Sequence, residues 1–142
     1  MNETLLKYFG YSKLKDKQED IINSILNKKN TIGILATGYG KSICYQLPYL
    51  LTKKSVIVIS PLISLMEDQK YKLQSLNIDV YCLNSNNPNK QSNKYDLKNG
   101  KTGIIYISPE YLINSKEFII DLVERNLLSL VAIDESHCLS TW

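Results

Sequence analysis

Short apolar runs, separated by amphipathic stretches, recur along most of the chain. Four of these runs are rich in Val and Ile and do not alternate with polar residues: Thr31–Leu35, Ser55–Ile59, Gly103–Ile107 and Leu130–Ile133. Unbroken apolar runs of this length are typical of strands buried on both faces of a parallel sheet. A weaker run, Asp79–Leu83, predicts a fifth strand.

Apolar residues at helical spacing occupy the segments around the predicted strands. Four segments carry this pattern: Asp16–Lys28, Lys41–Leu51, Leu62–Leu76 and Glu117–Arg125. Strands that alternate with helices predict an α/β fold, in which helices flank a mostly parallel sheet and the crossovers are right-handed. The stretch Asn84–Gly100 is rich in Asn, Ser and Lys. It is predicted to be a solvated surface loop with one exposed helix.

Composition narrows the class of protein only slightly. The 142 residues fit one domain, and a hydrophobic share of 44% is ordinary for a soluble globular protein. The net charge of +3 permits a nucleic-acid partner without requiring one. Because Arg125 is the only arginine, the basic side chains suit phosphate contacts better than bidentate base reading.

Cysteine spacing and hydropathy bear on location. Cys44, Cys82 and Cys138 lie far apart, which argues against a zinc site and favours a reducing compartment. The first residues do not have the pattern of a secretory leader, and no apolar stretch is long enough to span a membrane. We therefore expect a soluble, intracellular protein without a membrane partner. These features do not distinguish the nucleus from the cytoplasm or nucleoid.

A glycine-rich turn follows the first predicted strand and precedes a predicted helix. Gly38 and Gly40 allow the backbone N–H groups to approach a phosphate, and the helix N-terminus adds its dipole. Lys41 is then placed to reach the β- and γ-phosphates of a nucleotide, and the Ser42 hydroxyl to bind Mg²⁺. Leu35 stands where the strict phosphate-loop pattern has glycine, so a simple strand-to-helix turn with an incidental lysine remains the alternative.

Two adjacent carboxylates follow the last predicted strand. Asp134 is a candidate Mg²⁺ ligand, and Glu135 is a candidate for orienting and deprotonating an attacking water. A polar turn after a buried strand is the alternative, but an upstream phosphate loop makes an acidic pair the expected second half of a nucleotide site. His137, the only histidine, is assigned a coupling role between nucleotide and nucleic acid rather than proton transfer.

With both halves of the site placed, the chain resembles superfamily 2 helicases and, within them, the RecQ family of DNA helicases. Five segments carry the resemblance: Phe9–Tyr11 with Leu14, Lys15 and Gln18; Ala36–Pro48; Ile59–Gln69; Tyr106–Glu110; and Asp134–Trp142. They look like the family's upstream motif, phosphate loop, motif Ia, motif Ib and motif II, in that order, with a DEAH-like box in the last. The resemblance implies a RecA-like P-loop lobe that uses ATP and Mg²⁺.

The resemblance also implies roles for individual residues. Tyr11 is expected to stack on adenine, Gln18 to read its edge and Lys15 to contact the nucleotide, while Thr37, Gly38, Tyr39 and Gly40 belong to the phosphate loop. Contacts with single-stranded DNA are expected from Ser60, Pro61, Ser64, Ser108, Pro109 and Glu110. Helix capping is the alternative interpretation of the two Ser-Pro pairs, and both roles can hold at once. Trp142 is expected to begin a DNA-sensing loop, or else to be a frayed end.

Several positions depart from the family pattern. Lys15 stands in place of the usual Arg and Leu14 in place of Phe, which weakens planar contact with the nucleotide. Tyr39 replaces a usual Gly in the phosphate loop, so that position must accommodate a bulky ring. Ser136 replaces the commoner Ala and is a mild change. None of these departures removes a catalytic group.

The resemblance predicts an ATP-dependent 3′–5′ DNA helicase of the kind used in DNA recombination and repair, represented here by a truncated first lobe. Residues 1–30 are expected to form N-terminal helices with the adenine-reading motif, and residues 31–142 the RecA-like lobe. A second RecA-like lobe, with its arginine finger, is expected to be missing, so the chain alone is expected to turn over little ATP. The partners implied are single-stranded or forked DNA. A catalytically inactive nucleotide- or nucleic-acid-binding module and an RNA helicase lobe are the alternatives.

Overall fold

The computed structural model contains a five-stranded sheet with strand order β1-β5-β2-β4-β3. It describes residues 2–10, 23, 32–35, 41–60, 63–84 and 87–134, without the side chains of 2, 32–35, 41–44, 63–65, 133 and 134. The strands are β1 (Ile32–Leu35), β2 (Ser55–Ile59), β3 (Val80–Leu83), β4 (Ile104–Ile107) and β5 (Leu128–Asp134). All neighbouring strands are parallel, which confirms the predicted α/β fold, including the weaker fifth strand.

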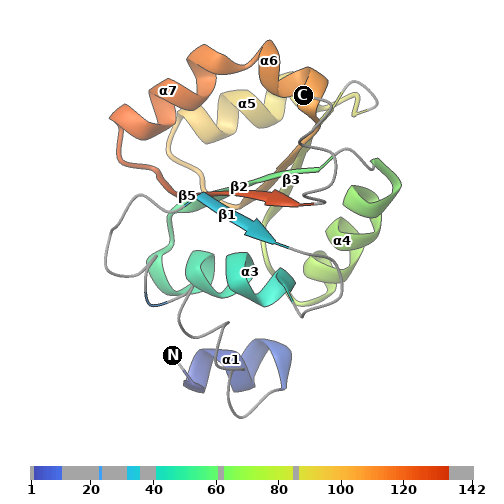
Figure 1. Cartoon of the computed structure of the whole chain (residues 1–142), viewed down its shortest axis with the longest axis vertical. Helices are drawn as coiled ribbons and strands as arrows, with labels where there is room; N and C mark the ends of the chain where they lie inside the picture. Colours follow the sequence, from blue (N-terminus) through green and yellow to red (C-terminus); the bar gives the residue numbers. More distant parts are fainter. Residues whose placement is uncertain are drawn as a thin grey trace.

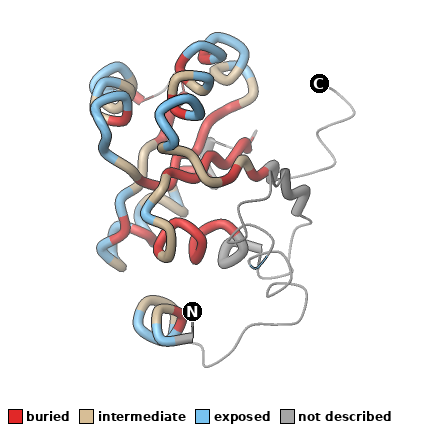
Figure 2. Tube along the Cα trace, turned by 90° about the vertical axis from the view of Figure 1, so that its left-hand side faces the viewer, coloured by how far each residue is buried: buried red, intermediate tan, exposed pale blue. Residues whose placement is uncertain are grey.

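Helices cover both faces of the sheet (Figure 1). One face carries α3 (Lys41–Thr52) and α4 (Ile63–Ser75), and the other carries α5 (Lys90–Lys98), α6 (Pro109–Ile113) and α7 (Lys116–Glu124). Successive residues of β2 alternate between the two cores: Val56 and Val58 pack toward α3 and α4, whereas Ile57 and Ile59 pack toward α5 and α7. The unbroken burial of β2 follows from this arrangement, because each face of the sheet is covered (Figure 2).

A further helix, α1 (Asn2–Phe9), packs on the outer side of α3 (Figure 1). The contact is centred on Leu5 and Leu47, which are both fully buried and form a small separate cluster with Phe9 and Leu51. Of the predicted helix Asp16–Lys28, the structure describes only Asn23, which is helical. None of the helices described is long and apolar enough to cross a membrane.

The prediction of a solvated loop at Asn84–Gly100 is partly wrong. The segment does carry a helix, α5, with both exposed and half-buried residues, but Asn84 and Asn87 are buried, and Leu97 anchors α5 in the core. The Asn87 side chain donates to the Cys82 carbonyl at 2.6 Å and accepts from the Asn89 backbone N–H at 2.9 Å. The Asn87 amide thus satisfies backbone groups of a tight turn, whereas the Asn84 amide donates to the Met66 sulfur at 3.5 Å.

Candidate nucleotide and nucleic-acid site

All five strands end at one side of the sheet, which we call the carboxyl edge and define by the last strand residues Leu35, Asp134, Ile59, Ile107 and Leu83. Parallel α/β sheets bind their ligands at this side, because the loops and helix N-termini that follow the strands converge there. Each candidate motif after residue 30 directly follows one of these ends. The sheet order therefore determines which motifs are neighbours.

The two halves of the expected nucleotide site are adjacent on this edge. β1 and β5 are parallel neighbours, and in their register Leu35 lies opposite Asp134. Leu35 is the last strand residue before the predicted phosphate loop, and α3 begins at Lys41. The backbone thus brings residues 99 positions apart in sequence side by side. A strand–loop–helix unit beside an acidic strand end is the arrangement that a Mg-nucleotide requires.

Much of the predicted nucleotide site lies outside the described residues. This holds for the residues expected to contact the base, most of the phosphate loop and the end of the chain: Tyr11, Lys15, Gln18, Thr37, Gly38, Tyr39, Gly40, Pro61, Glu135, His137 and Trp142. For Lys41, Ser42, Ser64 and Asp134, the backbone is described but the side chain is not. The structure therefore brings together the backbone positions of the site, and the side-chain roles stay predictions.

Ser60 and Ser108, two of the predicted DNA contacts, follow neighbouring strands at the same edge. The Ser60 backbone N–H donates to the Ile107 carbonyl at 3.0 Å, and the Ser108 N–H donates to the Leu83 carbonyl at 3.3 Å. Both residues are almost fully buried. The ladder of backbone hydrogen bonds thus continues one residue past the strands and holds Ser60 and Ser108 side by side.

Ser108 acts as the N-cap of α6. Its Oγ accepts a hydrogen bond from the Tyr111 backbone N–H at 3.3 Å, and Pro109 occupies the first turn of the helix. Glu110 lies in that first turn and is exposed. The capping interpretation is therefore confirmed for Ser108. A DNA contact by this motif stays a prediction, and its exposed part is the start of α6 rather than the serine hydroxyl.

A buried polar network behind the carboxyl edge was not predicted from the sequence. The Tyr45 and Tyr106 hydroxyls lie 2.8 Å apart, Gln46 also hydrogen bonds with Tyr106, and the Gln46 Nε2 donates to the Gln69 Oε1 at 3.5 Å. Burial raises the pKa of Tyr106 far above its usual range, with the Tyr45 hydroxyl adding to the effect. The network joins α3, which follows the phosphate loop, to β4 and α4. The sequence signal that could have indicated this network is Gln46, a polar residue in an otherwise apolar helix segment.

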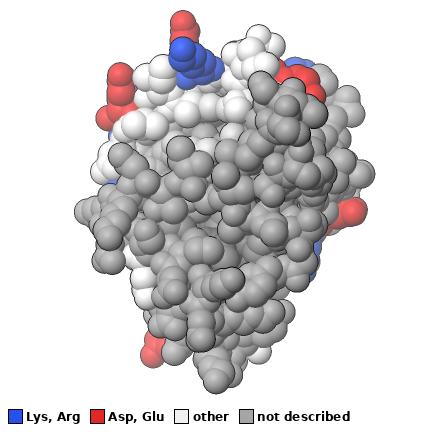
Figure 3. All heavy atoms as spheres, in the orientation of Figure 1, with Lys and Arg blue, Asp and Glu red and all other residues white. Residues whose placement is uncertain are grey.

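Residues outside the described ranges make up most of the face that contains the ends of β1 and β5 (Figure 3). In Figure 3 the described charged side chains of this face lie near its outline and are of both signs.

A parallel sheet with the phosphate-loop strand beside an acidic strand end defines the class of RecA-like nucleotide-binding lobes. The chain belongs to the DEAD/DEAH box helicase family, which it matches over residues 15–142.

Curated relatives include RecQ-type helicases. The chain is 39% identical to the ATP-dependent DNA helicase RecQ of Haemophilus influenzae over 140 residues, and 42% identical to the exonuclease/ATP-dependent helicase WRN of Mus musculus over 141 residues. These matches cover 97% of this chain but only 22% and 10% of the two relatives. A protein of Acanthamoeba polyphaga mimivirus, named as an ATP-dependent RNA helicase, is 42% identical over 142 residues, which is 26% of its length.

The chain therefore spans about a quarter or less of the length of these relatives. Among solved structures, one named as a hypothetical ATP-dependent RNA helicase from Sulfolobus tokodaii aligns with a TM-score of 0.60 at 16% identity. The alignment covers 93% of this chain and 49% of that one, and it supports the fold. The predicted RecQ resemblance and the predicted RecA-like fold are both confirmed.

Proposed function

We propose that this chain is the ATP- and DNA-binding first lobe of a RecQ-type, ATP-dependent 3′–5′ DNA helicase. The observation that carries the proposal is the register of β1 and β5, in which Leu35, just before the phosphate loop, lies opposite Asp134. The RecQ-type relatives, which match nearly the whole chain, support the choice of DNA helicase. Functions in DNA recombination and repair follow from the same resemblance.

The nucleotide half is proposed to work by positioning and charge stabilisation. Lys41, the first residue of α3, stabilises the charge on the β- and γ-phosphates, together with the amides of Thr37, Gly38, Tyr39 and Gly40. Glu135 orients the attacking water and accepts its proton. Tyr11, Lys15 and Gln18 hold the adenine and its nucleotide, and this motif defines a proposed N-terminal region, residues 1–30, ahead of the lobe at 31–142.

Mg²⁺ fits the residues present. Ser42 lies in the first turn of α3 and Asp134 at the end of β5, and hard oxygen donors on either side of a phosphate loop are the ligands that Mg²⁺ prefers. When bound, the ion neutralises charge that develops on the phosphate oxygens. Ser42 and Asp134 are the residues proposed to hold it.

The DNA half is proposed to lie beside the nucleotide half on the carboxyl edge. Ser60, Pro61 and Ser64 follow β2, while Ser108, Pro109 and Glu110 follow β4, and helix starts of this kind bind backbone phosphates. Since β2 pairs with both β5 and β4, the proposed DNA motif after β2 adjoins the acidic end of β5. His137 and Trp142 are proposed to couple the two halves.

Turnover is proposed to require a second RecA-like lobe, because the arginine finger of such motors comes from outside the first lobe and contributes roughly 10³–10⁵ in rate. The test adds the remaining portion of the Haemophilus influenzae RecQ in trans and measures ATP hydrolysis with single-stranded DNA. Little turnover by the chain alone, turnover with both parts, and its loss in Glu135→Gln support the proposal. If ATP turnover is the same in Glu135→Gln as in the unmodified chain, the proposal is contradicted. If the chain binds ATP but no mixture with the RecQ portion and DNA hydrolyses it, an inactive module is favoured.

RNA is the second candidate substrate, favoured by the mimivirus relative, which is named as an RNA helicase. The two substrates differ at the 2′-hydroxyl, which a protein can contact only in RNA. Fluorescence anisotropy with single-stranded DNA and RNA of the same base sequence separates them. Tighter binding of DNA supports the first proposal, and tighter binding of RNA supports the second.

A further inference from the structure

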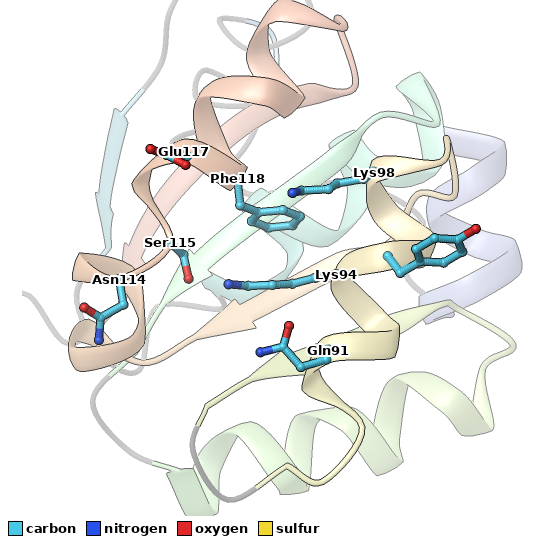
Figure 4. A pocket seen from close by; sticks show the side chains of 8 residues that line it. Gln91, Lys94, Lys98, Asn114, Ser115, Glu117 and Phe118 are labelled. Carbon is cyan, nitrogen blue, oxygen red and sulfur yellow. The ribbon is translucent and has the colours of Figure 1, made fainter.

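An open pocket of about 370 Å³ lies between α5 and α7, on the face of the sheet opposite α3 and α4. We call it the α5–α7 pocket, and Figure 4 shows its lining. The side chains that matter for its chemistry are Lys94, Tyr95 and Lys98 from α5, Asn114 from the end of α6, and Ser115 and Glu117 from the start of α7. None of these residues belongs to the nucleotide or nucleic-acid motifs described above.

Two lysines give the pocket its positive charge. Lys94 is half-buried, and its Nζ lies 4.5 Å from the centre of the Tyr111 ring and 5.5 Å from that of Phe118. The rings hold the ammonium group in place without neutralising it. Lys98, one turn later on the same face of α5, is exposed. Within the described part of the chain, neither ammonium group has a carboxylate partner.

Ser115 supplies a hydrogen-bonding group that the protein itself does not use. The residue is 2% exposed, and its Oγ has no hydrogen-bond partner among the described residues. Ser115 is the N-cap residue of α7, yet it makes no capping bond, whereas the Ser108 hydroxyl caps α6. In Figure 4 the Ser115 hydroxyl and the Lys94 ammonium group point toward one another. A buried hydroxyl without a partner costs free energy, so a ligand that accepts its hydrogen bond is favoured there.

The start of α7 adds unpaired donors to the same place. The first backbone N–H groups of any helix lack partners within the helix and carry its positive dipole end. Glu117 lies in this first turn, but its carboxylate is exposed and in Figure 4 it points away from Lys94. Two ammonium groups, a free hydroxyl and a helix N-terminus therefore surround a space that suits one anionic phosphate group.

The surroundings of the α5–α7 pocket indicate what kind of molecule carries the phosphate group. α6, which begins within the Ser108–Glu110 motif, is only five residues or about 8 Å long, so the start of α7 follows closely behind that motif. Tyr95, next to Lys94 in sequence, is 69% exposed and lines the same pocket. An exposed aromatic ring beside lysines and amide side chains such as Asn114 is typical of surfaces that bind single strands, where bases stack and phosphates pair with cations.

We propose that the α5–α7 pocket binds a backbone phosphate of single-stranded nucleic acid, held by Lys94, Lys98 and Ser115, with Tyr95 stacking on an adjacent base. The proposal rests on the proposed function and extends its nucleic-acid track beyond the motif after β4. It predicts that the strand continues across the start of α7.

The test compares the chain with Lys94→Ala/Lys98→Ala by fluorescence anisotropy of a labelled single-stranded oligonucleotide at several salt concentrations. The variant should bind about five-fold more weakly near 0.1 M salt, with a salt dependence shallower by roughly 0.7, as expected for one lost phosphate contact. Lys7→Ala/Lys101→Ala is the matched control. It removes the same charge from exposed positions on α1 and before β4, and it should bind as the unmodified chain does.

Ser115→Ala provides a second, independent arm. Because the hydroxyl has no partner in the protein, its removal should not lower the thermal unfolding midpoint, yet it should weaken oligonucleotide binding by about five-fold. A merely structural serine would show the reverse pattern. Tyr95→Ala should weaken binding of the same oligonucleotide but leave the salt dependence unchanged.

The outcomes separate the two proposals. If Lys94→Ala/Lys98→Ala and the unmodified chain bind the oligonucleotide with equal affinity and equal salt dependence, the proposal for the α5–α7 pocket is wrong, and the proposed function is unaffected. Failure of the unmodified chain to bind any oligonucleotide would count against the proposed function. Inorganic phosphate, titrated at constant ionic strength, distinguishes the source of the phosphate. The proposal is wrong if phosphate raises the unfolding midpoint of the unmodified chain but not that of Lys94→Ala/Lys98→Ala, while both proteins bind the oligonucleotide equally well. The pocket is then a site for small anions.

Discussion

The hydroxyl of Tyr45 lies 2.8 Å from the hydroxyl of Tyr106, with both rings buried and meeting edge to face. Tyr45 lies one turn into the helix that begins at Lys41, and Tyr106 lies in the strand that ends at the Ser108–Glu110 motif. A single buried hydrogen bond thus connects the elements that carry the proposed nucleotide and nucleic-acid contacts. Gln46 extends this connection to Gln69 on α4.

Tyr106→Phe should destabilise the chain by about 1–3 kcal/mol, because it removes the hydrogen bonds that the hydroxyl makes with Tyr45 and Gln46 inside the core. Chemical denaturation measures the change in the free energy of unfolding. Tyr71→Phe is the matched control, since Tyr71 is 68% exposed on α4 and should change stability little. If both substitutions lower the free energy of unfolding by the same amount, the hydrogen bond between Tyr45 and Tyr106 does not stabilise the fold.

Leu5→Ala should loosen α1 from α3 and cost about 2–5 kcal/mol, because Leu5 is completely buried against Leu47. Leu6→Ala, at the adjacent and 59% exposed position, should change stability by less than about 0.5 kcal/mol. Thermal unfolding of the two variants provides the comparison. If Leu6→Ala costs as much as Leu5→Ala, the packing of α1 described above is wrong.

Ser108→Ala should cost about 1 kcal/mol, because it removes the side-chain acceptor of the Tyr111 N–H at the start of α6. Ser108→Thr keeps an acceptor at the same place and should recover most of the loss. Measuring DNA affinity on both variants separates capping from direct contact. An affinity that falls in Ser108→Ala and recovers with stability in Ser108→Thr indicates capping, and an affinity that stays low in Ser108→Thr although stability recovers contradicts it.

Alkaline pH should destabilise the chain partly through Cys82. Burial raises the pKa of this thiol from 9.0 to about 11, so the folded state binds more protons than the unfolded state between these values. Stability is therefore fully present below pH 9.0 and falls as the pH rises toward 11, by about 2–3 kcal/mol from this group. Cys82→Ala should show a shallower loss over the same window, measured by urea unfolding at several pH values. An unchanged pH slope would exclude this cause.

The sheet could be predicted from the sequence because its strands are buried on both faces, which forces unbroken apolar runs such as Ser55–Ile59. The start of β5 was missed by two residues, because Ser129 interrupts the apolar run while its hydroxyl donates to the Ser55 carbonyl at 3.4 Å. Asn84 and Asn87 were predicted to be solvated because composition does not reveal which amides find buried hydrogen-bond partners in the folded chain.

The nucleotide motifs could be recognised because a phosphate loop and an acidic strand end need particular residue types at particular spacings. That these motifs are adjacent could not be predicted from the sequence, because strand order depends on contacts between distant parts of the chain. Leu35 and Asp134 are neighbours only because β5 lies between β1 and β2. The α5–α7 pocket had no sequence signal either. Lys94 and Ser115 come from separate helices and meet only in the folded chain.

The most direct test of the nucleotide site is equilibrium binding of ATP to this chain by isothermal titration calorimetry, with and without Mg²⁺. The unmodified chain should bind ATP, and more tightly when Mg²⁺ is present. Lys41→Ala should weaken binding roughly 10–100-fold, as expected for a lost charge-assisted contact, and Asp134→Asn should abolish the benefit of Mg²⁺. ATP binding that is unaffected by both substitutions would contradict a nucleotide site at the adjoining ends of β1 and β5.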